Sequence, residues 1–425
     1  MDADALTRAD SITADVADKY QKFVNPTALA LLKIAGFDKV EWEGSGATLK
    51  DIHGTEYIDC LGGYGTFSLG HANPRVVAAV TEQMQRLPLS SKTFLNKPLA
   101  DLAALLAEIT PGDLQYSFIC NSGAEALEGA IKFARMASGR TKIISAEGSY
   151  HGKTLGALSA SGRDSYKTPF APLLPGFVHV PFGDIAALTA AVDEETAAIL
   201  LEPIQGENGI RIPPDGYLKA ARQLADQHGA LLILDEVQTG LCRTGKFFAC
   251  NWEDVAPDIM TLAKSLGGGV MPVGAIVGTA KVWNAVFHEN PYLHTSTFGG
   301  NEAACVAGIT ALTIMREENF AEQARIKGEK LLSGLKGIQA KHPKLVMDVR
   351  GRGLMIGVEF SDADIQKLTI GSLVENGVVV AYTLNNTKIM RVQPPLVITD
   401  ELIEMVIAAF DRALTDTADV LSLLD

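Results

Sequence analysis

The sequence lacks the features that mark several classes of protein. It has only five cysteines in 425 residues and no CxxC pair, which excludes a disulfide scaffold and a zinc ribbon and fits a reducing compartment. It also lacks an apolar run long enough to cross a bilayer, and the N-terminal stretch MDADALTRADSITADVADKYQKF has no signal-peptide core. We therefore expect a cytoplasmic protein without a membrane anchor.

Positive charge is in the minority. The chain has 37 Lys and Arg against 50 Asp and Glu, a formal net charge of −13, which argues against binding to nucleic acid or to anionic membranes. Hydrophobic residues make up 47% and charged residues 20%, so the chain has the material for a large core and is not disordered. The length predicts about two or three domains.

The pattern of apolar residues changes along the chain. The first forty residues predict a polar helix and then an amphipathic helix ended by Gly36, and Gly54 marks a turn between two short strands. From about Leu99, apolar runs alternate with helical stretches, which predicts a mostly parallel sheet in an α/β fold. After about Phe320, helices with charged faces around a strand predict a second, smaller α+β domain. The runs expected to form buried strands include YSFIC, TKIIS, AAILL, LLILD and IMTLA.

Ligands of open α/β sheets bind beyond the carboxyl ends of the strands, so the residues that follow each run are candidates for a binding site. YSFIC leads into Ser122, Gly123 and Ala124. Ser122 and Glu125 have the spacing of a capping box at a helix start, and Gly123 lets the backbone approach a ligand closely. Such a helix start can bind a phosphate, although an ordinary helix cap explains the same pattern.

Two further strand ends carry ionisable groups. LLILD ends in Asp235, a carboxylate that can hold a cationic ring nitrogen or form a structural salt bridge. IMTLA is followed by Lys264 and a triple glycine, and a lysine at the end of a buried run is unusual. Burial lowers the pKa of a lysine, as an amine that forms a Schiff base requires. An exposed loop lysine is the alternative.

The three strand ends together match one coenzyme. Pyridoxal phosphate needs backbone donors for its phosphate, a carboxylate for its pyridinium nitrogen and an amine for its aldehyde. Other motifs do not fit: Glu147 stands where a P-loop ending in Gly152-Lys153-Thr154 needs its first glycine, and GRGLMIG is out of register with a dinucleotide fingerprint. We expect no metal site, because the eight histidines show no metal-ligand spacing.

Seven ordered blocks of the sequence resemble the class III, ornithine-type aminotransferases, which are fold-type I enzymes dependent on pyridoxal phosphate. The resemblance runs from about residue 25 to residue 414. Within the class, DCLGGYGTFSLGH, FAPLLPGFVHVPFGD and YTLNNTKIMRVQPPL are most similar to putrescine (diamine) aminotransferases. The seven blocks are NSGAEALEGAIKFAR, SYHGKTLGALSAS, EPIQGENG, LILDEVQTGLCRTGK, TLAKSLGGGVMPVGA, HTSTFGGN and MRVQPPL.

The resemblance implies a fold and its domains. It predicts a large coenzyme-binding domain at residues 61–318, whose mostly parallel sheet is of the seven-stranded type. It predicts a small α+β domain at residues 319–425, to which the N-terminal segment 1–60 contributes.

The resemblance also implies roles around the coenzyme ring. Lys264 would bind the coenzyme covalently and later move a proton between substrate and coenzyme. Asp235 would pair with the pyridine nitrogen, and Gln238 would hydrogen-bond the ring hydroxyl. Val237 and Tyr150 would pack on opposite ring faces, although each is also explained as an ordinary packing residue.

The same resemblance assigns the phosphate site and the assembly. The hydroxyl of Ser122 and the backbone N–H groups of Gly123 and Ala124 would hold the phosphate. Thr297 would reach that phosphate from the neighbouring subunit, which implies a homodimer with active sites at the interface. His151 is interpreted as structural rather than catalytic.

Substrate recognition is assigned to three further residues. Arg391 would bind the α-carboxylate of 2-oxoglutarate or glutamate, a bidentate contact that suits a guanidinium. Glu207 would pair with Arg391 when the substrate lacks an α-carboxylate, although a surface carboxylate is the alternative. Tyr64, with Gly65 and the loop around Thr93, is placed in the substrate pocket from its position alone.

The chain departs from the family pattern twice, reading QGENG for QGEGG and FGGNE for FGGNP. Asn208 is expected to alter only the backbone freedom beside Glu207. Glu302 replaces a proline shortly after Thr297, so the inter-subunit phosphate contact is the feature it would affect.

The implied function is transfer of the terminal amino group of a putrescine-like diamine or similar ω-amine to 2-oxoglutarate or pyruvate, with ping-pong kinetics through pyridoxamine phosphate. An acetylornithine, ornithine or 4-aminobutyrate aminotransferase is the first alternative, and a biosynthetic enzyme aminating a longer-chain aldehyde or ketone is the second. A different pyridoxal phosphate reaction or an inactive relative also remains open, and intact Lys264 and Asp235 argue against the latter.

Overall fold

The computed structural model describes residues 3–423, and it begins with two helices and a small sheet. Helix α1 spans Ala3–Lys19, a π-helical turn follows, and α2 spans Pro26–Ile34. The Asn25 side chain caps α2, and Gly36 follows it with φ 73°, as the sequence predicts. Strands β1 (Glu41–Ser45), β2 (Thr48–Asp51) and β3 (Glu56–Asp59) come next, and the turn between β2 and β3 contains Gly54. No helix within residues 3–423 is both long and apolar enough to cross a membrane.

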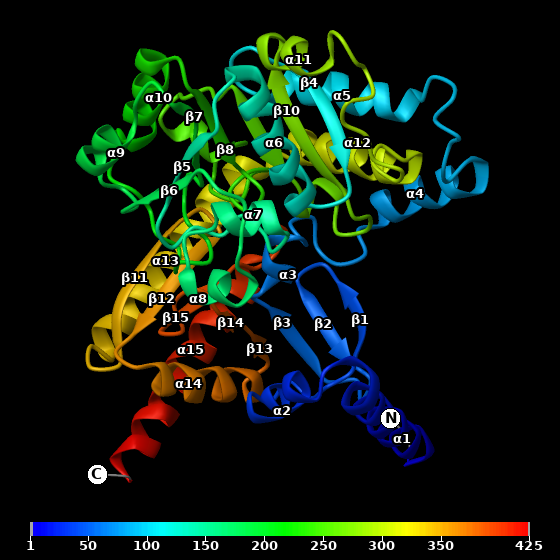
Figure 1. The fold of residues 1–425 in the computed structure, drawn as a ribbon. Coiled ribbons are helices and arrows are strands. Elements are labelled where there is room, and N and C mark those ends of the chain that lie inside the picture. The colour runs from blue at the N-terminus through cyan, green and yellow to red at the C-terminus, as the bar shows by residue number, and fades with distance from the viewer. Residues whose placement is uncertain (1–2, 424–425) are drawn as a thin grey trace.

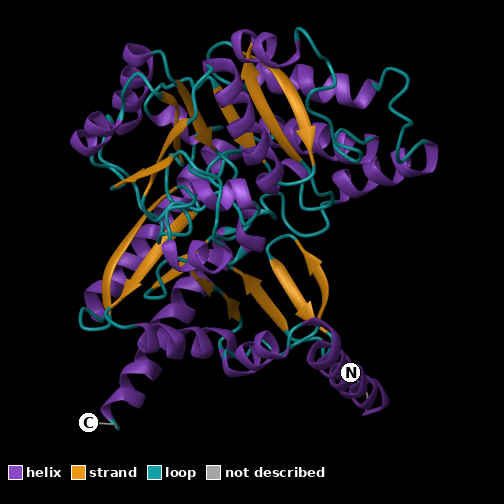
Figure 2. Ribbon diagram, viewed as in Figure 1, coloured by secondary structure: helices purple, strands orange, loops and turns teal. Residues whose placement is uncertain are grey.

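A seven-stranded sheet forms the upper part of the molecule (Figures 1 and 2). Strand β10 runs antiparallel to both of its neighbours, and all other pairings in the sheet are parallel. The predicted mostly parallel sheet is therefore confirmed. Its order is β4 (Leu114–Cys120), β10 (Gly274–Thr279), β9 (Ile259–Leu262), β8 (Leu231–Asp235), β7 (Thr196–Leu201), β5 (Lys142–Ala146) and β6 (Phe177–Val180).

Both faces of this sheet are buried, which explains why its strands read as continuous apolar runs. In β8, Leu231 and Ile233 belong to one apolar cluster with α6 (Gly123–Ser138). Leu232 and Leu234 belong to the other cluster, with α10 (Tyr217–His228). Successive side chains of a strand point to opposite faces, so α6 and α10 cover opposite sides of the sheet. The remaining helices of this part are α3 (Gly62–Gly65), α4 (Pro74–Arg86), α5 (Lys97–Ile109), α7 (Leu155–Ala160), α8 (Asp164–Lys167), α9 (Ile185–Ala191), α11 (Ala280–Phe287) and α12 (Glu302–Glu317).

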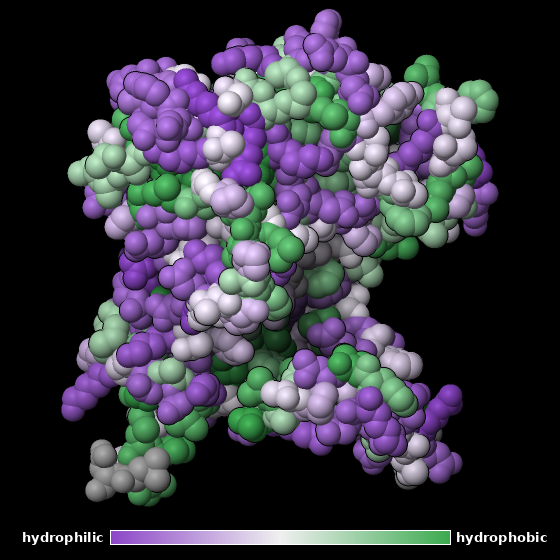
Figure 3. Space-filling model, viewed as in Figure 1, coloured by the Kyte–Doolittle hydropathy of each residue, from purple (hydrophilic) through white to green (hydrophobic). Residues whose placement is uncertain are grey.

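The C-terminal part contains a four-stranded antiparallel sheet with the order β11-β12-β15-β14. Strand β13 does not belong to this sheet. It pairs in parallel with β3, so the C-terminal part completes the sheet that the N-terminal strands begin. Figure 3 shows a narrowed middle where the seven-stranded sheet meets the two smaller sheets. The elements are α13 (Phe320–Lys341), β11 (Val346–Arg352), β12 (Met355–Phe360), α14 (Ala363–Glu375), β13 (Val378–Val379), β14 (Ala381–Tyr382), β15 (Ile389–Val392) and α15 (Asp400–Ser422).

The domain division stays a prediction. The outer limits of the predicted segments, at residues 1–2 and 424–425, lie outside the described residues.

Two glycines of α13 provide a matched test of packing between that helix and the turn after β11. A Cβ at Gly328 would lie 2.1 Å from the carbonyl oxygen of Gly353, whereas a Cβ at Gly337 would meet nothing within 4 Å. We expect Gly328→Ala to lower the melting temperature, because overpacking costs about 1–3 kcal/mol. Gly337→Ala should leave it unchanged or raise it, since alanine favours a helix by roughly 0.5–1 kcal/mol. Thermal unfolding followed by circular dichroism measures both, and equal effects would contradict the packing.

Candidate active site

Four strand ends meet at one cavity of about 560 Å³. Strands β4, β7, β8 and β9 all point their carboxyl ends toward it, the edge at which open α/β sheets bind ligands. The residues that line it there include Ser122 after β4, Glu202 after β7, Asp235 at the end of β8 and Lys264 after β9. The three strand ends singled out in the sequence are therefore brought together, with a fourth beside them.

The start of α6 forms one wall of the cavity. Ser122 caps the helix, and its Oγ accepts a hydrogen bond from the Glu125 N–H at 3.2 Å. The Glu125 carboxylate bonds the N–H of Asn121 at 2.8 Å rather than that of Ser122, so the predicted capping box forms only in part. The N–H groups of Gly123 and Ala124 lie in the first turn, where a helix has no internal acceptors. They and the Ser122 hydroxyl suit an anionic group.

Lys264 is buried and held in an unusual backbone conformation. Its φ of 49° is left-handed, which costs energy for a residue with a side chain. Burial, together with the Arg391 charge, lowers the pKa of Lys264 to about 8 against the opposing pull of nearby carboxylates. With the Gln238 amide oriented so that its oxygen faces the amine, that oxygen accepts from Lys264 Nζ at 2.7 Å. The amine is therefore positioned and partly neutral near physiological pH.

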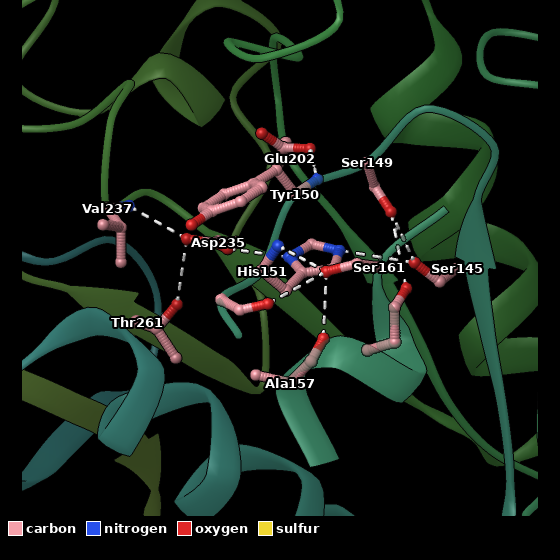
Figure 4. Close-up of polar contacts among 12 residues, drawn as sticks. Ser145, Ser149, Tyr150, His151, Ala157, Ser161, Glu202, Asp235, Val237 and Thr261 are labelled. Carbon is pink, nitrogen blue, oxygen red and sulfur yellow. Dashed lines mark hydrogen bonds and ion pairs between the residues drawn. The ribbon is translucent and has the colours of Figure 1, made fainter. Parts of the chain in front are cut away.

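Asp235 is fixed by hydrogen bonds on both oxygens (Figure 4). Its Oδ2 lies 2.8 Å from His151 Nδ1, and its Oδ1 accepts from the Val237 N–H at 3.1 Å and the Thr261 hydroxyl at 3.3 Å. Burial alone would lower the pKa of His151, but its contact with Asp235 raises it above the ordinary value. The contact therefore favours the protonated form of His151, which would compensate the buried carboxylate. Sequence reasoning assigned His151 a structural role and did not connect it with Asp235.

Glu202 was not predicted, although it ends the run AAILL just as Asp235 ends its own strand. The Glu202 carboxylate accepts from the Tyr150 N–H at 3.1 Å and so fixes the backbone of a residue that lines the cavity (Figure 4). Burial raises the pKa of Glu202 to about 7.

Across the cavity, a Cβ on Gly123 would lie 3.0 Å from a Val237 methyl, so only glycine allows α6 this close approach.

A buried ion pair lies beside the amine. Arg391 Nη2 donates to Glu207 Oε2 at 2.6 Å, and both residues are buried. Burial alone would raise the pKa of Glu207, but the Arg391 guanidinium lowers it below its ordinary value. The Arg391 guanidinium also lies 5.3 Å from the centre of the Tyr64 ring. Glu207 lines the cavity, so the alternative of a surface carboxylate is wrong.

The other residues assigned to the substrate pocket differ in how close to the site they lie. A Cβ on Gly65 would lie 3.8 Å from both Gln238 and Lys264, so this glycine lies against the site. Tyr64 precedes it with φ 58° and is 46% exposed. Thr93 is exposed, and its hydrogen bonds are confined to Ser91.

Thr297 is exposed and does not line the cavity of its own chain. Its segment is tied to the loop after α4, because Lys92 donates to the Gly299 carbonyl at 2.6 Å. The Glu302 carboxylate, where the family has a proline, accepts from the Ser90 N–H at 2.9 Å and holds the same loop. This departure therefore adds a contact next to the Thr297 segment.

Asn208 does more than alter the backbone, so the expectation for it is wrong. Its Nδ2 donates to Gln205 Oε1 at 2.8 Å, and a Cβ on Gly148 would overlap its side chain. Asn208 therefore links the Glu207 segment to the loop that carries Tyr150.

Comparison with known proteins agrees with this geometry. The profile of the family Aminotransferase class-III matches residues 39–414. The chain belongs to the class III aminotransferases. Its fold is the α/β fold type I of that family, it catalyses transamination, and its cofactor is pyridoxal phosphate.

Solved structures of class III aminotransferases are similar over most of the chain. An ornithine aminotransferase from Toxoplasma gondii, whose active site holds pyridoxal phosphate at partial occupancy, has 36% identity and a TM-score of 0.85, covering 90% of this chain and 91% of that one. An acetylornithine aminotransferase from Elizabethkingia anophelis has 34% identity and a TM-score of 0.78, with coverages of 89% and 94%. An (S)-enantioselective omega-transaminase from Thermomicrobium roseum has 30% identity and a TM-score of 0.86, with coverages of 95% and 98%.

The residues around the cavity fit the pyridoxal phosphate of a class III aminotransferase. The first turn of α6 offers donors for a phosphate, Asp235 offers a carboxylate paired with His151, and Lys264 offers a buried amine. These groups come from three different strand ends of the same sheet edge.

We expect His151 to act on the coenzyme through Asp235. His151→Ala should weaken coenzyme binding about tenfold or more, because a hydrogen bond to a charged group contributes roughly 1.5–3 kcal/mol. His151→Asn, which keeps a donor near the position of Nδ1, should restore part of the loss. Titration of the coenzyme-free protein with pyridoxal phosphate measures both. Equal affinity of the Ala variant and the wild type would contradict this role.

The lowered pKa of Lys264 predicts how coenzyme capture depends on pH. Only the neutral amine attacks an aldehyde, and the fraction of neutral Lys264 rises with pH around a pKa of about 8. The rate of covalent capture should therefore rise through pH 8 and level off above it, as measured by stopped-flow absorbance. A rate that still climbs steeply near pH 10 would indicate an ordinary lysine. The Lys264→Ala variant is the control and should show no covalent capture.

Proposed function

We propose that this enzyme transfers the terminal amino group of a diamine or similar ω-amine, such as putrescine or cadaverine, to 2-oxoglutarate or pyruvate. The observation that carries this proposal is the buried Glu207–Arg391 pair at 2.6 Å. While Glu207 neutralises the Arg391 guanidinium, that guanidinium is not free to bind a carboxylate on the donor or to repel an ammonium group. Amines whose reacting carbon bears no carboxylate suit that arrangement.

We assign the coenzyme contacts as follows. Ser122, Gly123 and Ala124 at the start of α6 bind the phosphate. Asp235, compensated by His151, binds the ring nitrogen. The other contacts are Gln238 to the ring hydroxyl, and Val237 and Tyr150 on the two ring faces.

When bound, pyridoxal phosphate supplies an aldehyde that accepts the amino group and a ring that withdraws electrons from the donor carbon. Lys264 Nζ removes the proton from that carbon in the proposed mechanism and returns it on the coenzyme side. Its pKa of about 8 suits a group that must both take and give a proton near neutral pH. The Gln238 oxygen, 2.7 Å away, orients the amine.

The acceptor uses the same pocket in the second half-reaction. Arg391 binds the α-carboxylate of the keto acid once Glu207 has released the guanidinium. Because donor and acceptor occupy one site in turn, the kinetics should be ping-pong.

We also propose a homodimer in which Thr297 contributes to the phosphate site of the partner subunit. Phe94, Leu95 and Phe298 are at least 59% exposed and lie on the two segments joined by Lys92 near Thr297. Exposed apolar side chains gathered in this way are typical of a protein interface.

There are two alternative functions. The first is an acetylornithine, ornithine or 4-aminobutyrate aminotransferase, and the similarity to ornithine and acetylornithine aminotransferases at 36% and 34% identity favours the first two of these donors. The second is a biosynthetic enzyme that aminates a longer-chain aldehyde or ketone, and the similarity to an omega-transaminase at 30% identity is compatible with it.

A panel of diamines, ω-amino acids and α-amino acids, each assayed for glutamate formation from 2-oxoglutarate, separates these candidates. We expect diamines to give the highest kcat/KM, because the closed Glu207–Arg391 pair keeps the guanidinium from binding a donor carboxylate. Preference for ornithine, acetylornithine or 4-aminobutyrate would replace the diamine assignment.

The Lys264→Ala variant is the control for this panel. It should lose both turnover and the visible absorbance of the coenzyme linked to Lys264.

A further inference from the structure

The loop between β14 and β15 reaches the carboxylate of Glu207. The Leu384 N–H donates to Glu207 Oε2 at 3.1 Å, and this is the same oxygen that accepts from Arg391 at 2.6 Å. The next N–H, that of Asn385, donates to the backbone carbonyl of Glu207 at 2.9 Å. Two successive residues of the loop therefore hold both the side chain and the backbone of Glu207.

The same two residues are anchored to the part of the chain that carries the seven-stranded sheet. Asn385 Nδ2 donates to the Gly148 carbonyl at 2.7 Å, two residues before Tyr150. The Leu384 carbonyl accepts from Arg163 Nη1 at 2.7 Å and from the Tyr166 hydroxyl at 3.1 Å. The loop is thus fixed from both sides, although Arg391 itself lies on β15 of the small sheet (Figure 1).

Asn208 stabilises the segment around Gly148, to which Asn385 is bonded. It donates to Gln205 Oε1 at 2.8 Å, and Gln205 Nε2 in turn donates to the Glu147 carbonyl at 2.9 Å. The Asn208 side chain also fills the space next to Gly148, whose carbonyl receives Asn385. Asn208 is one of the two positions at which the chain departs from the QGEGG and FGGNP patterns.

We propose that Leu384 and Asn385, supported by Asn208, form a latch that holds Glu207 on Arg391 and so disfavours dicarboxylate ligands relative to amine donors. The inference rests on the proposed function, in which a keto acid needs Arg391 free. Glu207 Oε2 accepts from both groups, so a movement of Glu207 away from the guanidinium also breaks its bond to the Leu384 N–H, in a buried site where each lost hydrogen bond is costly. The latch is a specificity-determining and positioning element and does not contact the reacting atoms.

The test compares two neighbouring asparagines in the holoenzyme. Asn385→Ala removes the anchor to Gly148, whereas Asn386→Ala is the control, because the Asn386 side chain bonds only Lys388 N within its own turn. Calorimetry with glutarate, a dicarboxylate that cannot react, measures how readily Arg391 becomes free. We expect Asn385→Ala to bind glutarate about two- to tenfold more tightly, the equivalent of one hydrogen bond. Asn386→Ala should bind it like the wild type.

Kinetics provide the second measurement. In Asn385→Ala, the KM for 2-oxoglutarate should fall while that for the amine donor does not. Unchanged or weaker glutarate binding, or equal shifts of both KM values, would overturn the latch.

A second variant keeps the test decisive if Asn385→Ala does not fold. Asn208→Gly, which restores the family residue, should shift glutarate binding in the same direction, and tighter binding again supports the latch while no change overturns it. Glutarate binding requires no turnover, so it can be measured even if no diamine in the panel yields glutamate. Failure of the proposed donor and failure of the latch are therefore separate results.

Discussion

Burial of the Lys264 amine among charged side chains is the interaction on which the rest of the site depends. A buried ammonium is unfavourable unless it loses its proton or is compensated. Here both effects operate: burial and Arg391 lower the pKa to about 8, while Glu207 and Asp235 oppose them. The arrangement requires four strand ends to meet at one edge of the sheet and β15 to approach them from the small sheet.

Two of the three carboxylates that line the cavity are each paired with a basic side chain. Asp235 pairs with His151, and Glu207 pairs with Arg391. Because the two pairs are separate, the Glu207–Arg391 pair can open while Asp235 keeps its contact with His151. In the proposed function Asp235 binds the ring nitrogen, and Glu207 pairs with Arg391 for the donor and releases it for the acceptor. The latch adds the Leu384 N–H as a further partner of the Glu207 carboxylate.

Much of the fold and part of the site could be predicted from short stretches of sequence. The buried strands were recognisable because a strand covered on both faces is buried at every position and apolar at nearly all of them, as in β7 and β8. Lys264 and Asp235 were recognisable because ionisable groups rarely end such runs. The remaining roles came from resemblance to a family. Glu202 also ends an apolar run and was missed, because the sequence does not say which strand ends share a cavity.

The sequence by itself determined the class of chemistry, since a helix start, a carboxylate and a lysine at strand ends are all local features. Only the tertiary structure decided how these groups are compensated. His151 meets Asp235 across 84 positions of the chain, and Arg391 meets Glu207 across 184. Hydrogen bonds between residues so far apart leave no periodic trace in the sequence, because they depend on how sheets and loops pack. The latch at Leu384 and Asn385 belongs to this second group, since only the packed loop brings their N–H groups to Glu207.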